Sequence, residues 1–110
     1  MSVTVASNHV IAEATFNDDA LAAYLAANDM LDALLDFQEF KWVLTAQIRR
    51  RREMNDFIPE RHWERAITSL VIRTNSRILE LKRALRAAGR GDEMYAALAD
   101  LREDRMEDES

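Results

Sequence analysis

Three carboxylates with helical spacing are the first side chains in this chain that could carry out chemistry. Asp32, Asp36 and Glu39 lie four and three residues apart, so in a helix they would share one face. Such carboxylates can act as general acid and base, or they can hold a divalent metal ion. No Glu-x-x-His element and no second acidic segment with a matching histidine accompanies them. We therefore predict a solvated or ion-paired face without a metal, and a carboxylate-metal hydrolase is the alternative.

The other reactive residue types form no pattern specific to catalysis. His9 and His62 are the only histidines, and they are far apart in the sequence. The absence of cysteine excludes disulfide bonds, zinc–thiolate sites and cysteine nucleophiles. The HExxH, GxxxxGK and GxSxG motifs are also missing. We expect a protein that is not an enzyme, with no catalytic residue and no cofactor.

An unbroken run of four arginines could bind phosphate groups, with an affinity that falls as salt rises. At the end of a helix, however, the same cations stabilise the helix dipole, and consecutive residues point around the helix. Because the formal net charge is -5, we favour pairing with carboxylates of this chain or of a protein partner over nucleic acid. The residues predicted to bind a partner are Arg49, Arg50, Arg51, Arg52, Arg61, Arg65 and Trp42.

Charge is distributed in three blocks along the chain. Residues 1–40 hold seven acids and no lysine or arginine, and residues 41–90 hold thirteen basic residues and five acids. Residues 91–110 hold eight acids and two arginines. Nearly all positive charge is carried by arginine, which can bind a carboxylate with two parallel hydrogen bonds. This layout predicts either complementary packing within the fold or a charged surface for a partner.

Helix start and stop signals position these residues in an all-α fold. Two glycines and one proline leave few sites for tight turns, which argues against a sheet-rich protein. Asn17 and the Asn28-Asp29 pair are N-terminal caps, Pro59 is suited to the first turn, and Gly89 is suited to a helix end. The expected fold is a small bundle of about four helices, two long and two short. The predicted helices span 18–27, 29–53, 59–88 and 92–106.

The two ends of the chain are predicted to lie outside this bundle. Valines alternate with polar residues near the N-terminus, which favours a short extended or hairpin arm over 1–16. The bundle domain would then span 17–106, followed by an acidic disordered tail over 107–110. The first residues lack the basic and apolar regions of a signal peptide, and no apolar run reaches the ~20 residues that span a bilayer. We therefore expect a cytoplasmic protein that does not bind membranes.

Both long helices are predicted to be apolar on two faces. Beside its core stripe, the helix over 29–53 carries Leu31, Leu35 and Trp42 on a second face. The helix over 59–88 carries Ile72 and Leu79, seven residues apart, among arginines. The short helices and the N-terminal arm could cover these faces within one chain. We favour a homo-oligomer, with self-association through Leu31, Leu35, Ile72 and Leu79.

Together these patterns favour a protein–protein interaction module that acts as an adaptor, an assembly factor or an inhibitor of a larger protein or nucleoprotein complex. Compact acidic helical proteins of this size are common among phage and mobile-element inhibitors, so an anti-CRISPR-like inhibitor is the specific hypothesis. The hypothesis follows from likeness to that class of proteins in size, charge and helical content. The alternative is a nucleic-acid-binding regulatory protein that uses the arginine-rich middle segment.

The arginine run generates a test. If these side chains only offset the helix dipole, changing Arg50 and Arg51 to Gln should alter the free energy of unfolding by less than ~1 kcal/mol. Chemical denaturation of the wild type and the double variant measures this difference. A larger loss of stability would show that the two arginines hold the fold together.

Overall fold

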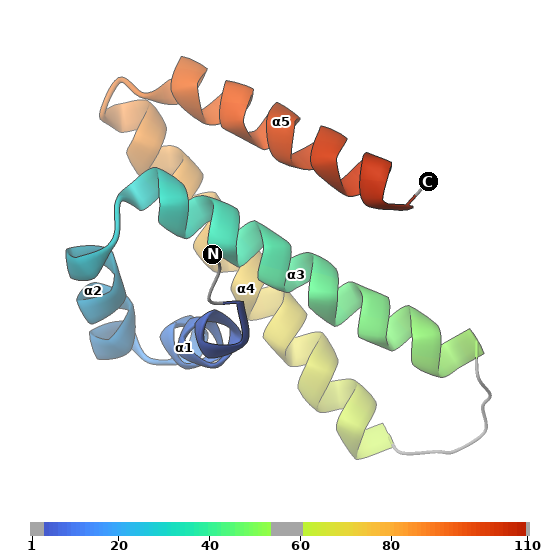
Figure 1. The fold of residues 1–110 in the computed structure, drawn as a ribbon. Helices are drawn as coiled ribbons and strands as arrows, with labels where there is room; N and C mark the ends of the chain where they lie inside the picture. Colours follow the sequence, from blue (N-terminus) through green and yellow to red (C-terminus); the bar gives the residue numbers. More distant parts are fainter. Residues whose placement is uncertain (1–3, 54–60, 110) are drawn as a thin grey trace.

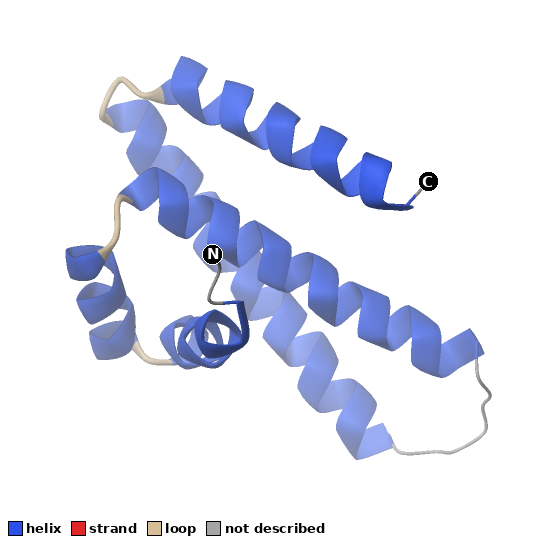
Figure 2. Cartoon of the chain, viewed as in Figure 1, coloured by secondary structure: helices blue, strands red, loops and turns tan. Residues whose placement is uncertain are grey.

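A computed structural model describes residues 4–53 and 61–109 of the 110-residue chain, and these residues are almost entirely helical (Figures 1 and 2). The all-α prediction is confirmed, with five helices in the described ranges rather than about four. No strand occurs in this part of the chain. The helices are α1 (Thr4–Phe16), α2 (Asp18–Ala27), α3 (Met30–Glu53), α4 (Arg61–Ala87) and α5 (Gly91–Glu109).

The N-terminal segment differs from its prediction: residues 4–16 form helix α1, so the extended or hairpin arm predicted for 1–16 is wrong over these described residues. Within α1, Ile11, Ala14 and Thr15 are buried, and their spacing of three and four residues is helical. The Thr15 hydroxyl donates to the Ile11 carbonyl oxygen at 2.8 Å. A helix satisfies its backbone groups internally, whereas two isolated strands would be marginal in water. The alternating valines therefore did not determine the local structure.

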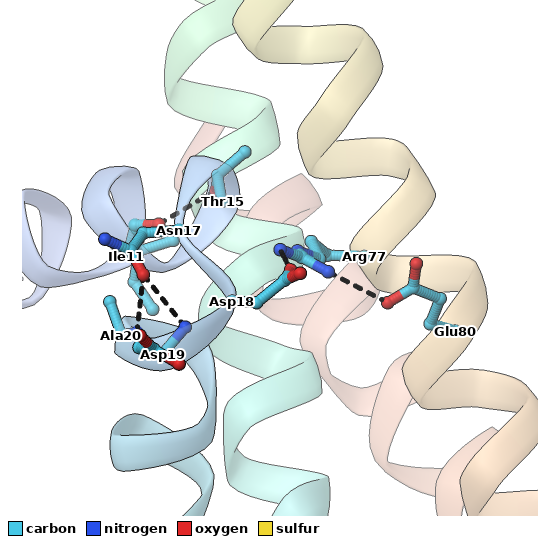
Figure 3. Close-up of polar contacts among 8 residues, drawn as sticks. All are labelled: Ile11, Thr15, Asn17, Asp18, Asp19, Ala20, Arg77 and Glu80. Carbon is cyan, nitrogen blue, oxygen red and sulfur yellow. Dashed lines mark hydrogen bonds and ion pairs between the residues drawn. The ribbon is translucent and has the colours of Figure 1, made fainter.

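Helix α2 begins where the sequence predicted, after a single-residue turn. The side chain of Asn17 accepts hydrogen bonds from the backbone N–H groups of Asp19 and Ala20 at 2.8 and 3.1 Å (Figure 3). Asp18 and Asp19 place negative charge in the first turn, at the positive end of the helix dipole. The predicted cap and the predicted bounds 18–27 are confirmed.

The N-terminus of α3 is capped by Asp29, one of the two residues predicted for this role. Its carboxylate accepts from the Leu31 N–H at 3.1 Å, and its carbonyl oxygen accepts from the Ala33 N–H at 2.9 Å. The C-terminus of α3, Glu53, is also as predicted. Pro59, the predicted start of the next helix, lies outside the described residues.

The end of helix α4 at Ala87 is followed by a glycine in the left-handed backbone region, as predicted. Gly89 has a φ of 78°. The Arg90 N–H donates to the Leu85 carbonyl oxygen at 2.9 Å, and the Gly89 N–H donates to the Arg86 carbonyl oxygen at 3.0 Å. This pair of bonds is the Schellman motif, which satisfies the last carbonyl groups of a helix. No glycine or proline follows Gly91, and α5 continues to Glu109, beyond the predicted end near 106.

The hydrophobic core forms around α3, which contacts the other four helices. Helices α3 and α4 run side by side in opposite directions, and α5 returns beside them (Figure 1). The ring of Tyr24 packs edge-on against Phe37, with centroids 6.1 Å apart. The buried hydrophobic residues are Ile11, Ala14, Leu31, Ala33, Leu34, Phe37, Phe40, Leu44, Ile78, Leu81, Leu85 and Met94. Among the described residues, none of the helices combines the length and the apolar character needed to span a bilayer.

The two glycines provide a matched test of the turn between α4 and α5. Gly89→Ala should lower the free energy of unfolding by roughly 1 kcal/mol, because its positive φ strains any residue with a Cβ atom. Gly91→Ala should cause no such loss, since its Cβ would lie at an ordinary 3.6 Å from Arg86 Cγ. Denaturant unfolding of both variants measures the difference. Equal stabilities would show that the turn does not require the left-handed conformation.

Candidate binding surface on helix α4

Of the helically spaced carboxylates Asp32, Asp36 and Glu39 on α3, Asp36 makes a hydrogen bond within the fold, whereas the other two are exposed. The Tyr24 hydroxyl of α2 donates a hydrogen bond to Asp36, and burial together with this bond raises the pKa of Tyr24. Loss of solvent around its carboxyl group, and then the charge of Asp36, raise the pKa of Glu39. No cluster of three or more histidines and acids suited to a metal ion occurs among the described residues. The alternative of a metal hydrolase at Asp32, Asp36 and Glu39 gains no support from this arrangement.

The two sides of α4 have opposite characters. Its inner side buries Thr74, Ile78, Leu81 and Leu85, as the helical period predicted. Its other side, the outer face, is formed by exposed residues that include two large aliphatics. Ile72 is 61% exposed and Leu79 is 45% exposed. The outer face consists of Arg65, Thr68, Ser69, Ile72, Ser76, Leu79, Arg83 and Arg86.

One edge of the outer face is fixed by polar contacts with α3. The Lys41 ammonium of α3 donates to the Asn75 side-chain oxygen of α4 at 2.8 Å. Near the C-terminal end of α3, the Arg52 guanidinium donates two hydrogen bonds to Glu64 Oε1, at 3.2 and 3.1 Å. These contacts hold the outer face of α4 turned away from α3.

The opposite edge is fixed by α1 and α2. The Arg73 guanidinium lies 5.2 Å from the centroid of the Phe16 ring, a cation–π arrangement. Arg77, whose side chain is only 14% exposed, pairs with Asp18 at 2.8 Å and with Glu80 at 3.3 Å (Figure 3). Its guanidinium therefore links the first residue of α2 to the side of α4.

A second arginine links two helix N-termini. The Arg90 guanidinium binds both carboxylate oxygens of Asp29, at 3.0 and 3.2 Å, and both of Glu93, at 2.9 and 3.1 Å. Asp29 is the cap of α3 and Glu93 lies in the first turn of α5. Hydrogen bonds from Arg90 lower the pKa of both carboxyl groups, and those two carboxylates raise the pKa of Arg90.

The predicted partner-binding residues fall into different environments. Arg50, Arg51 and Arg52 occupy the last turn of α3. Arg49 to Arg52 are all exposed, and the Arg52–Glu64 pair brings this end of α3 next to α4. Arg65 belongs to the outer face, whereas the side chain of Arg61 lies outside the described part. Trp42 is covered from α5, because the Arg105 guanidinium lies 4.6 Å from the centroid of its ring.

Two of the four residues predicted to mediate self-association are exposed. Ile72 and Leu79 are exposed as expected, but Leu31 is buried in the core and Leu35 is half-buried. The cause is that α1, α2 and α5 all contact α3 and cover its second apolar face. This was the intramolecular alternative for that helix. The uncovered apolar strip is on α4.

Sequence reasoning missed Arg77 and Arg90, which join distant parts of the chain. Each has a carboxylate three residues later, Glu80 and Glu93, and this spacing was visible in the sequence. Their other partners, Asp18 and Asp29, are 59 and 61 residues away. Those acids were recognised as features of helix starts, but their spacing carries no information on which arginine they meet.

The Arg90 cluster predicts how stability depends on pH. In the unfolded chain Asp29 and Glu93 recover their ordinary pKa values of 3.8 and 4.5, so they bind protons at higher pH than in the fold. Their contribution to stability is therefore complete above these values and is lost as pH falls through the lower folded-state values. Arg90→Gln should remove part of the fall in melting temperature on acidification.

Thermal unfolding across this acidic range tests the prediction, with Arg83→Gln as a control that removes one exposed arginine. The control should keep the wild-type pH profile. Parallel curves for the wild type and Arg90→Gln would show that the cluster does not link protonation to folding.

Comparison with known proteins adds no relative. No family model, no curated protein and no solved structure matches this chain. A functional hypothesis must therefore come from the surface itself.

Proposed function

We propose that this chain is a non-enzymatic protein-interaction module that binds another protein through the outer face of α4. The observation that carries this proposal is the exposure of Ile72 and Leu79, seven residues apart on a helix whose inner side is buried. Fully burying a large aliphatic side chain contributes roughly 1.5–3 kcal/mol, and covering the part of each that is still exposed contributes about half of this, before the costs of association are subtracted. Two such residues flanked by arginines form a small apolar centre with a charged rim, which is typical of protein interfaces.

The biological form of this function is an adaptor, an assembly factor or an inhibitor of a larger complex. The small helical fold and the exposed helix face support a role in which the chain occupies a site on a partner. An inhibitor of the phage or mobile-element class, acting in the cytoplasm, is the most specific version of this proposal.

A nucleic-acid-binding role is the second candidate, and the exposed arginines at the end of α3 favour it. Arg49 and Arg50 lie at the same end of the α3–α4 pair as Arg65. Phosphate contacts would produce a steep loss of affinity with increasing salt. Titration of duplex and single-stranded DNA and RNA at several salt concentrations tests this role, and no micromolar binding at low salt would reject it.

Because the outer face is exposed, we expect it to tolerate substitution by charged residues. Ile72→Glu combined with Leu79→Glu should lower the free energy of unfolding by about 1 kcal/mol per residue at most, because about half of each side chain is exposed to solvent. Matched controls on the inner side, Ile78→Glu and Leu85→Glu, bury a carboxylate and should cost more than ~3 kcal/mol each. Unfolding of the outer-face double variant would place Ile72 and Leu79 in the core and contradict the proposed surface.

Binding itself is tested by a photocrosslinking amino acid placed at residue 72, with residue 99 on α5 as the control position. We expect a discrete protein adduct in cells of the native source from residue 72, which disappears when Leu79→Glu is added. The absence of a protein adduct at residue 72, or an adduct with nucleic acid alone, would contradict the proposed function.

A further inference from the structure

We propose that the occupant of the outer face is an acidic amphipathic helix of a different protein, lying along α4 with apolar side chains over Ile72 and Leu79. This inference rests on the proposed function and adds the chemistry of the partner. It follows from the spacing of the exposed residues, from the charge around them and from the poor fit of a second copy.

The spacing of the exposed residues matches a helical partner. Arg65, Ile72, Leu79 and Arg86 follow one another at intervals of seven residues, which is two turns of a helix. They form a line roughly 30 Å long, with the aliphatics in the middle and an arginine at each end. A second helix presents side chains with the same repeat, so its apolar residues can pack along this line.

The charge of the outer face specifies an acidic partner. Arg65, Arg83 and Arg86 are exposed on it, and the face contains no acid. The acids at its two edges, Glu64 and Glu80, are paired with Arg52 and Arg77 respectively. Carboxylates at both ends of an apolar strip would therefore meet arginine at both ends of the interface.

Exposed aromatic rings lie beside the outer face and enlarge its apolar surface. The Tyr95 hydroxyl of α5 accepts a hydrogen bond from the Arg86 guanidinium at 3.2 Å, and Tyr95 is 56% exposed. At the other edge, the half-exposed Phe16 lies under Arg73. The Phe16 ring thus holds Arg73 and the Tyr95 hydroxyl holds Arg86 at the two edges of the outer face, where each guanidinium can bind a carboxylate of a partner.

A second copy of this chain fits the outer face poorly. In a symmetric antiparallel pair of α4 helices, Ile72 would face Leu79, but Arg65 would face Arg86 at both ends, which places like charges together. Pairing with the acidic side of α3 is no better, because among the described residues of that helix the exposed carboxylates Asp32 and Glu39 stand beside a single exposed large aliphatic. Val43 is the large aliphatic exposed on that side, at 39%.

The absence of cysteine from the chain allows a direct test by disulfide tethering. Ser76→Cys, on the outer face between Ile72 and Leu79, provides a single thiol for exchange with cysteine-containing helical peptides under a redox buffer. The first peptide carries two leucines seven residues apart, flanked by glutamates. In its three controls the glutamates become lysines, the leucines become glutamines, or a central proline breaks the helix. Mass spectrometry measures the fraction of protein tethered to each.

We expect the acidic helical peptide to tether about tenfold more strongly than its lysine counterpart, and more strongly than the glutamine and proline controls. Changing Arg65, Arg83 and Arg86 to Gln in the Ser76→Cys chain should remove the preference for acid. Equal tethering of the acidic and lysine peptides, or of the helical and proline peptides, would overturn the inference. So would a wild-type dimer in sedimentation that Ile72→Glu dissociates, or DNA or RNA that displaces the acidic peptide.

The two proposals fail in distinguishable ways. If the photocrosslinker at residue 72 captures a basic or non-helical segment of a protein, the module function stands and the acidic helix is wrong. If it captures no protein, the module function fails, whatever the peptides show.

Discussion

Helix α3 packs against all four other helices, so its apolar residues are buried on more than one side. Leu34 and Phe37 are fully buried, and Leu31 on the second face is covered as well. The neighbouring helices bury their apolar residues against such a central helix. Helix α4 packs its inner side against α3. Helices α1 and α5 also contact α4, but among the described residues they leave its outer face uncovered. The exposed aliphatics on α4 are therefore a consequence of how α3 is buried.

Part of the block pattern of charge is explained by pairing within the fold. Arg77 and Arg90 come from the basic middle of the sequence, and they bind Asp18 and Asp29 from the acidic first block. Both acids sit at helix N-termini, where a carboxylate is already favoured by the helix dipole. The same two carboxylates thus begin their helices and hold them against α4 and its C-terminal turn. Arginine suits this role because its planar group binds two carboxylates at once.

Local signals and helical periodicity predicted much of the fold. Asn17, Asp29 and Gly89 act through their own backbone neighbours, so their roles could be inferred from residue type and position. Periodicity also separated the two sides of α4. It failed for α1, where short alternation near the N-terminus resembled a strand and the buried pair Ile11 and Ala14 carried the helical signal. The cover of Trp42 by Arg105 and the long-range arginine pairs depend on tertiary packing, which spacing along the chain does not encode.

The arginines around Ile72 and Leu79 have two effects on association. An exposed aliphatic pair on a helix would otherwise promote pairing between identical chains, since apolar burial has no preference for its partner. With arginines along the same face, a symmetric approach of two copies brings like charges together, whereas a face with carboxylates gains attraction at the same positions. The acids that could have weakened this selectivity, Glu64 and Glu80, are bound at the edges by Arg52 and Arg77. Apolar burial thus supplies affinity for a partner on this face. Because the acids at its edges are already paired, the arginines of the face favour a partner with negative charge.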